Sequence, residues 1–363
     1  MFYELEASAY EKVRPLLAGM EHNLIALAVL DKTAPGRVRV DDTKAPRTIL
    51  MSTTKGFFLF GDKPVGEIFA SLQQLLLNDF FAKGRKSGLD EFILHYPHTD
   101  WQETVADLLS PKAPLILDHQ LYFRFAQQKV NWQEQLPSGY KMVRIDKAML
   151  ERVSLKNLPY IKNWAITSFK TLPEFLDNGF GFGLLKGDEV VSWCLANCIS
   201  GYRCEIGIHT DEAYRKQGFA TLVAAATVEH CLANSLFEIG WHCWSINVAS
   251  AATAEAVGFI KALEHPVVRI WFNAFDNLLA NGNFHLLHRR YGEAASCYEK
   301  AFAEFEGGVN KDVLDSQLFA NKTDRMRYYQ QAACAHALAG DPVAADRNLE
   351  KAYELGGYRY RLA

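Results

Sequence analysis

The sequence lacks the features of a membrane protein, a disulfide scaffold or a nucleic-acid binder. No apolar run reaches the ~18 residues of a membrane-spanning helix. The formal net charge of the 363 residues is only −3, so there is no basic excess to bind nucleic acid or an anionic membrane surface. The seven cysteines are an odd number without framework spacing. They predict reduced thiols and a cytoplasmic protein.

Nucleotide and metal motifs are missing too. No GxxxxGK[ST] loop is present, which disfavours ATP and GTP. The glycine cluster GFGFG at 179–183 leads into a strand and a turn instead of a helix, so it is not a dinucleotide fingerprint. Cys194 and Cys198 lie four residues apart without a second matching pair. We therefore expect buried thiols there and no metal site.

The sequence divides into three regions. Residues 1–135 alternate short helical and strand-like segments, and the polar, turn-rich stretch VNWQEQLPSG at 130–139 is expected to be the linker to the next region. A second mixed region covers residues 136–273, and alanine-rich helical patterns fill residues 274–363. These boundaries predict an α/β (α+β) protein with two mixed domains followed by an all-α region.

Hydrophobic periodicity locates the individual elements. Residues 8–30 and 66–83 are expected to be helical. The strands expected in the first region are RVRV, RTILMS, GFFLF, FILHY and LYFRF. In the second region we expect a hairpin from GFGFGLL to VVSWCLANCI, the strands CEIGIHT, EIGWHCWS and VVRIWF, and helices at 218–234 and SAATAEAVG.

The last ninety residues contain an internal repeat. The tripeptide EKA occurs at 299–301 and again at 350–352, each time late in an amphipathic helical segment. Small residues such as Ala294, Ala301, Ala345 and Ala352 would let paired helices pack closely. The segment resembles two tetratricopeptide helical hairpins, and a plain helical appendage is the alternative. Two hairpins are too few to bury a continuous core, so we expect the tail to pack on other parts of the chain.

The segment YRKQGFATL at 214–222 joins the strand CEIGIHT to the helix that follows. A helix start exposes free N–H groups and a positive dipole end, which suits a phosphate. Gly218 and Ala220 leave these N–H groups uncovered, and Gly218 can adopt a positive φ. Arg215 and Lys216 add positive charge. This pattern predicts an anion site.

These residues match a known family. Arg215-x-x-Gly218-x-Ala220 resembles the pyrophosphate-binding pattern of the GNAT (GCN5-related) N-acetyltransferases, and Asn247, Ser250 and the segment AEAVGF follow in the family's order. The chain is similar to the long zwittermicin-A-resistance-type acetyltransferases. The resemblance implies a GNAT fold for residues 136–273, and residues 1–135 look like a degenerate second copy without the phosphate loop.

The resemblance also implies how acetyl-CoA is bound. Backbone N–H groups of the loop would hold the pyrophosphate, and the strand 204–209 would pair with the pantetheine arm and polarise the acetyl carbonyl. Asn247 would contact the pantetheine or cap the next helix. The residues expected to bind the coenzyme are Ile208, His209, Arg215, Lys216, Gln217, Gly218, Phe219, Ala220, Thr221 and Asn247.

The reaction needs a base, because an alkyl ammonium with a pKa of ~10.4 must lose a proton before it attacks. Several members of the family carry a catalytic glutamate on this strand. Alternation puts Glu205 and His209 on the face opposite Cys204, Ile206 and Ile208, so we expect Glu205 to point into the cleft as the base. A surface or structural carboxylate is the alternative. The catalytic set is thus Glu205 and Asn247, with His209 and His242 as further candidate bases.

One departure from the family concerns the general acid. The usual tyrosine aligns with Ala254, so the proton donor to the departing thiolate is unassigned. The tryptophans near the cleft, Trp164, Trp193, Trp241 and Trp244, would suit an amine through cation–π contacts, although core packing is the favoured explanation for any one of them.

The sequence thus predicts an acetyl-CoA-dependent N-acetyltransferase acting on a small amine such as an antibiotic or a polyamine. The alternative is a non-catalytic acyl-CoA sensor whose helical tail binds a protein partner. A homodimer is left open.

Overall fold

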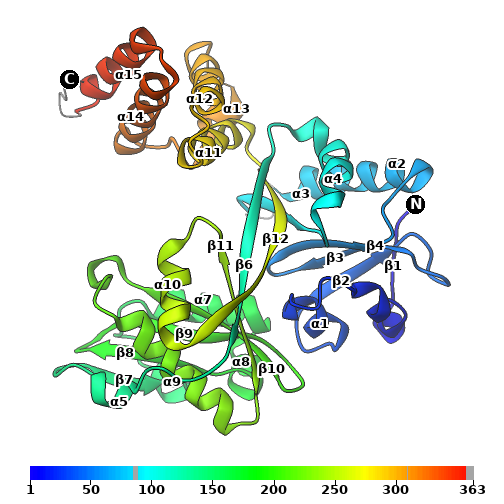
Figure 1. Ribbon diagram of the computed structural model, residues 1–363, viewed down its shortest axis with the longest axis vertical. Coiled ribbons are helices and arrows are strands. Elements are labelled where there is room, and N and C mark those ends of the chain that lie inside the picture. Colours follow the sequence, from blue (N-terminus) through cyan, green and yellow to red (C-terminus); the bar gives the residue numbers. More distant parts are fainter. Residues whose placement is uncertain (85–88, 309, 357–363) are drawn as a thin grey trace. The chain divides into compact units, whose positions relative to one another are not determined.

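The computed structural model describes residues 1–84, 89–308 and 310–356 (Figure 1). Two compact units are distinguished by their internal contacts, and each is considered by itself. The first holds residues 1–68, 94–103 and 118–267. The second holds residues 69–93, 104–117 and the chain from 268 onward. Several elements therefore begin in one unit and end in the other.

Twelve strands occur among the described residues. They are β1 (Tyr3–Glu4), β2 (Gly36–Val40), β3 (Thr48–Thr53), β4 (Gly56–Gly61), β5 (Glu91–His95), β6 (Ile116–Phe125), β7 (Lys141–Arg144), β8 (Gly181–Lys186), β9 (Glu189–Ser200), β10 (Arg203–Thr210), β11 (Glu238–Trp244) and β12 (Phe259–Trp271). All the segments expected to be strands are strands, and β6 and β12 are longer than the sequence pattern indicated.

The α-helices up to the tail are α1 (Leu24–Leu30), α2 (Gly66–Leu75), α3 (Ala82–Gly84), α4 (Gln102–Leu109), α5 (Trp132–Gln135), α6 (Lys147–Leu150), α7 (Leu158–Phe169), α8 (Leu172–Asn178), α9 (Phe219–Ala233) and α10 (Val248–Val257). The helix expected over 66–83 continues from α2 through a π-helical stretch at Leu76–Phe81. The helix expected over 8–30 is instead two 3₁₀ segments and the short α1. Pro15 and the positive φ of Gly19 explain the interruption.

One pattern of strands occurs twice along the chain. β2, β3 and β4 form an antiparallel meander, and β4 then pairs with β5 in parallel. In the same way β8, β9 and β10 form a meander, and β10 pairs with β11 in parallel. A helix connects the two parallel strands each time, α2 in the first case and α9 in the second. This recurrence agrees with the predicted fold class, a GNAT fold preceded by a GNAT-like half.

The two halves of the sheet exchange strands at their junction. The strand order is β1-β2-β3-β4-β5-β12-β6-β11-β10-β9-β8-β7. β6 comes from the first half of the sequence yet pairs antiparallel with β11, with Trp241 opposite Phe123. β12 comes from the second half and lies beside β5. The predicted boundary at residue 135 therefore separates two regions of sequence that share their sheet.

Helix α9 covers one face of the second half. It is apolar around its whole circumference, as expected from LVAAATVEHCL, and it packs against β8, β9 and β10. Ile206 and Cys204 of β10 lie in that core together with Phe219 and Val223. Helices α1 and α7 also pack against β9. The helix α9 is thus held firmly from its first turn, which fixes the loop in front of it.

The C-terminal tail is helical throughout its described part, as predicted. It contains α11 (Ala274–Leu287), α12 (Tyr291–Glu306), the short α13 (Lys311–Leu314), α14 (Lys322–Ala339) and α15 (Pro342–Glu354), drawn from yellow to red in Figure 1. Helices α11 and α12 pack together, as do α14 and α15. The two EKA tripeptides lie in α12 and α15. That these hairpins are tetratricopeptide-like remains a prediction.

The tail shares its unit with earlier segments of the chain. The side-chain amides of Asn277 and Asn281 on α11 donate to the carbonyl of Pro114, at 2.8 and 3.3 Å. Asp276 accepts hydrogen bonds from the Ser316 hydroxyl and the Gln317 backbone, which ties α11 to the loop before α14. No helix of the described residues is both long and apolar enough to cross a bilayer. All seven cysteines are free thiols, and only Cys334 is exposed.

The close contact between α11 and α12 gives a test of this packing. A Cβ at Gly282 would lie 2.6 Å from the ring of the fully buried Tyr298. We expect Gly282→Ala to destabilise the protein by ~1–2 kcal/mol, because overpacking costs ~1–3 kcal/mol and the better helix propensity of alanine returns only part of it. Denaturant unfolding followed by circular dichroism would measure the change.

Gly292 on α12 is the matched control for this change. No atom lies within 4 Å of the position its Cβ would take. Gly292→Ala should therefore be neutral or stabilise by up to ~1 kcal/mol. Equal destabilisation by both substitutions would contradict the packing of α11 on α12.

Candidate functional site

The loop before α9 has the conformation that the sequence predicted for an anion site. Gly218 is the residue before the helix and has a φ of 81°, in the left-handed region. No atom lies within 4 Å of where its Cβ would stand, so the helix start opens onto free space. Lys216 also has a positive φ, of 62°, which is uncommon and costly for a residue with a side chain. Strain of this kind is typical of functional loops.

The chemistry of this helix start is that of a phosphate cradle. The first N–H groups of α9 have no carbonyl one turn earlier to bind, and the helix dipole makes this end positive. The Arg215 guanidinium is anchored by a 3.3 Å hydrogen bond from its Nε to the carbonyl of Thr210. The Lys216 side chain is exposed beside it. Backbone donors and two cations therefore converge where a diphosphate would fit.

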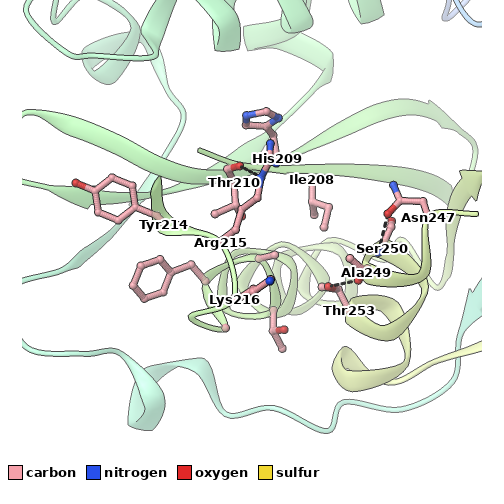
Figure 2. Close-up of a pocket in the computed structure, with 14 residues that line it drawn as sticks. Ile208, His209, Thr210, Tyr214, Arg215, Lys216, Asn247, Ala249, Ser250 and Thr253 are labelled. Carbon is pink, nitrogen blue, oxygen red and sulfur yellow. Dashed lines mark hydrogen bonds between the residues drawn. The ribbon is translucent and has the colours of Figure 1, made fainter. Parts of the chain in front are cut away.

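A pocket of about 600 Å³ opens in front of this loop (Figure 2). Its lining consists of Ile208, His209, Thr210, Tyr214, Arg215, Lys216, Gly218, Phe219, Ala220, Thr221, Asn247, Ala249, Ser250 and Thr253. The structure thus brings together all the residues expected to bind the coenzyme except Gln217. Thr210, Tyr214 and the residues from α10 were not part of the expected set, although Ser250 belongs to the segment that carried the family resemblance.

The strands beside this pocket diverge. Among the described residues, β10 pairs with β11 only from Arg203 to Glu205, opposite Glu238 to Gly240. From Ile206 to Thr210 its partner is β9 alone, and the β9 register shifts between Glu205 and Ile206. The edge of β10 that faces β11 is therefore open for most of its length. Such an edge can accept an extended ligand as an added strand.

Asn247 has the capping role that was one of its two expected roles. Its Oδ1 accepts a hydrogen bond of 3.1 Å from the Ser250 N–H at the start of α10. Ser250 in turn accepts from the indole N–H of Trp241. Ala254 is completely buried on the same helix, so the position of the family tyrosine offers no proton donor. The hydroxyl groups that α10 presents to the pocket are those of Ser250 and Thr253.

A second pocket of about 630 Å³ lies beside the same strand. It is lined by Asn157, Tyr160, Asn163, Trp164, Thr167, Trp193, His209, Asp211, Glu212 and Arg215. His209 and Arg215 line both pockets, so the two cavities meet at these side chains. The second lining combines aromatic rings and two carboxylates, which can interact with an organic cation, with neutral polar side chains and the Arg215 guanidinium.

His209 is held in place at this junction by a neighbouring ring. Its imidazole stacks on Trp193 with ring centres 4.5 Å apart. Partial burial lowers the pKa of His209 below its ordinary value, and the positive charge of Arg215 lowers it further against the opposing effect of Asp211. The imidazole is therefore neutral near pH 7 and able to accept a proton.

Glu205 lies on the predicted face of β10 but not in an open cleft. Its carboxylate is 3.0 Å from Nδ1 of His242, and both side chains are nearly buried, with exposed fractions of 12% and 11%. Burial alone would raise the pKa of Glu205. The charge of His242 and its hydrogen bond outweigh that effect and hold this pKa below the ordinary value. Glu205 lines neither pocket. The sequence predicted that the Glu205 side chain faces the cleft. In the structure it lies against His242 instead and is nearly buried.

On one face of β10, Gly207 and Trp164 separate the buried surroundings of Glu205 from the pockets at His209. A Cβ at Gly207 would lie 2.7 Å from the Trp164 ring and 2.5 Å from the Asn197 amide, so the indole covers this glycine. The indole N–H donates a 2.8 Å hydrogen bond to Asn197. Of the four tryptophans considered from the sequence, Trp164 and Trp193 line the second pocket, whereas Trp241 is in the core.

Comparison with known proteins gives a consistent result. A family model described as GNAT acetyltransferase matches residues 14–268. The chain is similar to the uncharacterized N-acetyltransferase YdfB of Bacillus subtilis, with 26% identity over 268 residues that cover 73% of this chain and 97% of that protein. Among solved structures it is similar to a GCN5-related N-acetyltransferase-like protein of Streptococcus suis, with a TM-score of 0.54 and 20% identity over 73% and 99% of the two chains.

The contact between Gly207 and Trp164 predicts the effect of a small substitution. We expect Gly207→Ala to cost ~1–3 kcal/mol of stability and to displace the Trp164 ring from the wall of the second pocket. Unfolding experiments would give the stability, and a crystal structure of the variant would give the ring position. Gly292→Ala serves again as the control for the same chemical change. An unmoved ring and unchanged stability would contradict this account of the wall.

Proposed function

Because the chain belongs to the GNAT acetyltransferase family and is an enzyme of N-acetyltransferase type, we propose that it transfers the acetyl group of acetyl-CoA to a primary amine of a small molecule. One observation carries the proposal. The phosphate cradle at Gly218 opens onto a pocket that meets a second, cation-compatible pocket at His209. An acyl donor and an amine could therefore approach the same side chain from two directions.

The fit of coenzyme A to the first pocket is supported by the space at Gly218. The backbone N–H groups from Gln217 to Ala220 would hold the pyrophosphate, with Arg215 and Lys216 balancing its charge. The open edge of β10 would hold the pantetheine arm, and an N–H of that edge would bind the acetyl carbonyl. When bound, the coenzyme supplies an activated acetyl thioester.

We assign the proton transfer to His209. A primary alkylamine is protonated near pH 7 and attacks only after it has lost a proton. The neutral imidazole of His209 is the candidate to take that proton, because it lines both pockets and is uncharged near pH 7. Its stack on Trp193 fixes its position. Glu205 would act on the amine only through intervening water, since its carboxylate is bound to His242.

The departing thiolate would leave without a tyrosine acid. A thiol has a pKa of about 8.5, so its anion is a tolerable leaving group near neutral pH. The Ser250 hydroxyl lines the pocket, accepts from the Trp241 indole and is suited to donate a hydrogen bond to the sulfur, whereas the Thr253 hydroxyl donates to the Ala249 carbonyl. This role requires only a hydrogen bond and not the loss of a proton from the hydroxyl.

The second pocket suggests the class of acceptor. Trp164, Trp193 and Tyr160 offer aromatic faces, and Asp211 and Glu212 add negative charge. This combination favours a cationic amine such as a polyamine or an amino-sugar antibiotic over an acidic or a purely apolar acceptor.

The coenzyme site can be tested at Gly218. We expect Gly218→Asp to lose acetyl-CoA affinity by at least ~100-fold, because a carboxylate would occupy the position proposed for the pyrophosphate. Isothermal titration calorimetry would measure it. Gly139→Asp is the matched control, since Gly139 has a φ of 84° and equally open surroundings but lines neither pocket. Equal affinities in the two variants would contradict the assignment.

The base can be tested by its pH dependence. His209→Gln should lower kcat by ~10²–10⁴-fold with acetyl-CoA affinity nearly unchanged. In the wild type, activity should fall as pH decreases through the lowered pKa of His209, because protonation removes the base. That acidic limb should disappear in His209→Gln and persist in Glu205→Gln. An acidic limb that persists in His209→Gln and disappears in Glu205→Gln would instead identify Glu205 as the base.

A further inference from the structure

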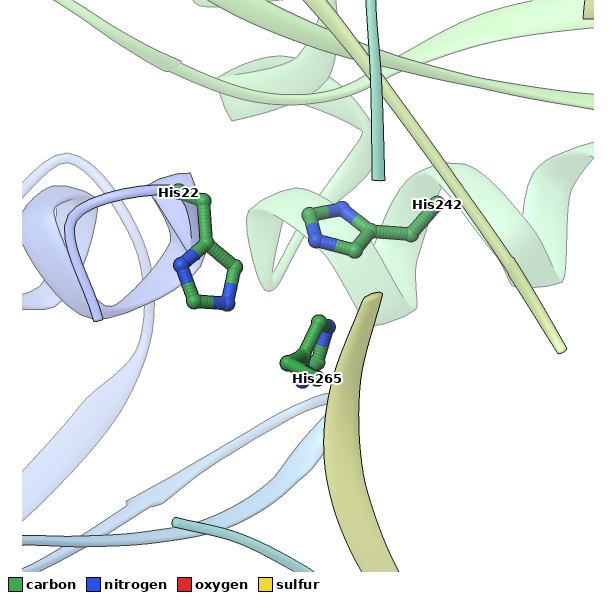
Figure 3. A group of neighbouring side chains, drawn as sticks. All are labelled: His22, His242 and His265. Atoms are coloured by element: carbon green, nitrogen blue, oxygen red, sulfur yellow. The ribbon is translucent and has the colours of Figure 1, made fainter. Parts of the chain in front are cut away.

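Three histidines from distant parts of the sequence meet inside the first unit. His22 precedes α1, His242 lies on β11 and His265 lies on β12. One ring nitrogen from each lies within 4.8 Å of the others, and Figure 3 shows the three imidazoles gathered around a common space. His22 and His265 are buried, with exposed fractions of 9% and 2%. No motif or spacing in the sequence groups them, and no metal was expected.

The ring nitrogens of this cluster are poorly satisfied. Nε2 of His242 and both nitrogens of His265 have no hydrogen-bond partner among the described residues. Buried polar atoms normally have a partner, and an exception in a native protein calls for an ion, a water molecule or a functional reason. Several such atoms directed at one space favour a single shared ligand over separate defects.

We propose that His22, His242 and His265 bind one divalent transition-metal ion, with zinc as the best fit. Imidazole nitrogen is a preferred zinc ligand, and three protein ligands leave a fourth position for water. Three imidazoles on one tetrahedral zinc would have ring centres about 5 Å apart, given Zn–N distances of ~2.0–2.1 Å. The observed centres are 4.5, 5.4 and 6.1 Å apart.

One of the three rings has the outer partner that metal ligands usually have. Nδ1 of His242 faces the Glu205 carboxylate at 3.0 Å, which leaves Nε2 for the metal. The Asn23 side-chain amide lies 2.9 Å from Nε2 of His22; with its oxygen turned toward that nitrogen, Nε2–H would donate to it and Nδ1 would be free for the metal. A carboxylate behind a ligating histidine fixes its tautomer and raises its basicity. Glu205 would therefore be a positioning residue for the metal.

The electrostatics of the cluster agree with this geometry. Burial, and then the nearby imidazoles of His242 and His95, lower the pKa of His22 to about 3. Burial likewise lowers the pKa of His265 well below its ordinary value. Neutral imidazoles are the form that coordinates a metal, so no proton has to be displaced from these two rings near pH 7. His95 lies near His265 but stacks flat on Phe58, outside the group whose nitrogens converge.

The experiment measures metal content, not catalysis. The full-length protein would be stripped with a chelator, equilibrated with zinc, passed through gel filtration and analysed by inductively coupled plasma mass spectrometry. We expect one zinc per chain and a rise in melting temperature with zinc. Cobalt substituted into the wild type should give the absorption bands of a tetrahedral site. Retention of no zinc by the wild type would overturn the proposal.

Variants test the individual residues. His265→Gln should weaken zinc binding by at least ~100-fold, and Glu205→Gln by ~10–100-fold. His230→Gln should bind zinc like the wild type, because His230 is a half-buried histidine of the same unit that packs on Phe180 away from the cluster. A folded His265→Gln protein with wild-type zinc content would also overturn the proposal. If that variant does not fold, the cobalt spectrum of the wild type decides.

Discussion

The limit of strand pairing at Glu205 and Gly240 determines most of what this site can do. Up to that point β10 and β11 form an ordinary parallel pair. Beyond it β11 is paired only on its other side, with β6, and β10 is paired only with β9. Backbone groups on the open edge of β10 are left to bind something other than protein. The register shift between Glu205 and Ile206 occurs at the same place. The open edge ends one short turn before the Gly218 loop, so an extended ligand bound along it would reach the start of α9.

The exchange of strands between the two halves keeps β11 paired within the sheet where it diverges from β10. β11 keeps a hydrogen-bonded neighbour after it parts from β10, because β6 pairs with its opposite edge from Gln120 to Arg124. β6 is supplied by the first half of the sequence. The N-terminal half, which lacks the phosphate loop, thus contributes to the site by completing the sheet. This is a physical reason for a chain to keep a copy of the fold that has no coenzyme loop of its own.

The sequence predicted the parts of the site that depend on local geometry. The phosphate loop is a run of six residues whose backbone conformation follows from Gly218 and the helix start, so a short motif was sufficient. Strand alternation also predicted the face on which Glu205 lies. What surrounds that face could not be predicted, because His22, His242 and Trp164 reach it from segments separated by many residues. Tertiary packing, and not periodicity, decides whether a strand carboxylate meets solvent or a buried imidazole. For the same reason the α10 hydroxyls were missed.

Glu205 and His209 show how one strand face can serve two purposes. They are four residues apart, which corresponds to about 13 Å along an extended chain. Gly207 lies between them, and its missing side chain is replaced by the indole of Trp164. That ring lines the second pocket on the side of His209, while Glu205 lies among buried histidines. The Glu205 carboxylate is already bound to an imidazole and lines neither pocket, whereas the His209 imidazole lines both. Strand alternation places both Glu205 and His209 on this face of β10. The position of Trp164 between them favours His209 as the base.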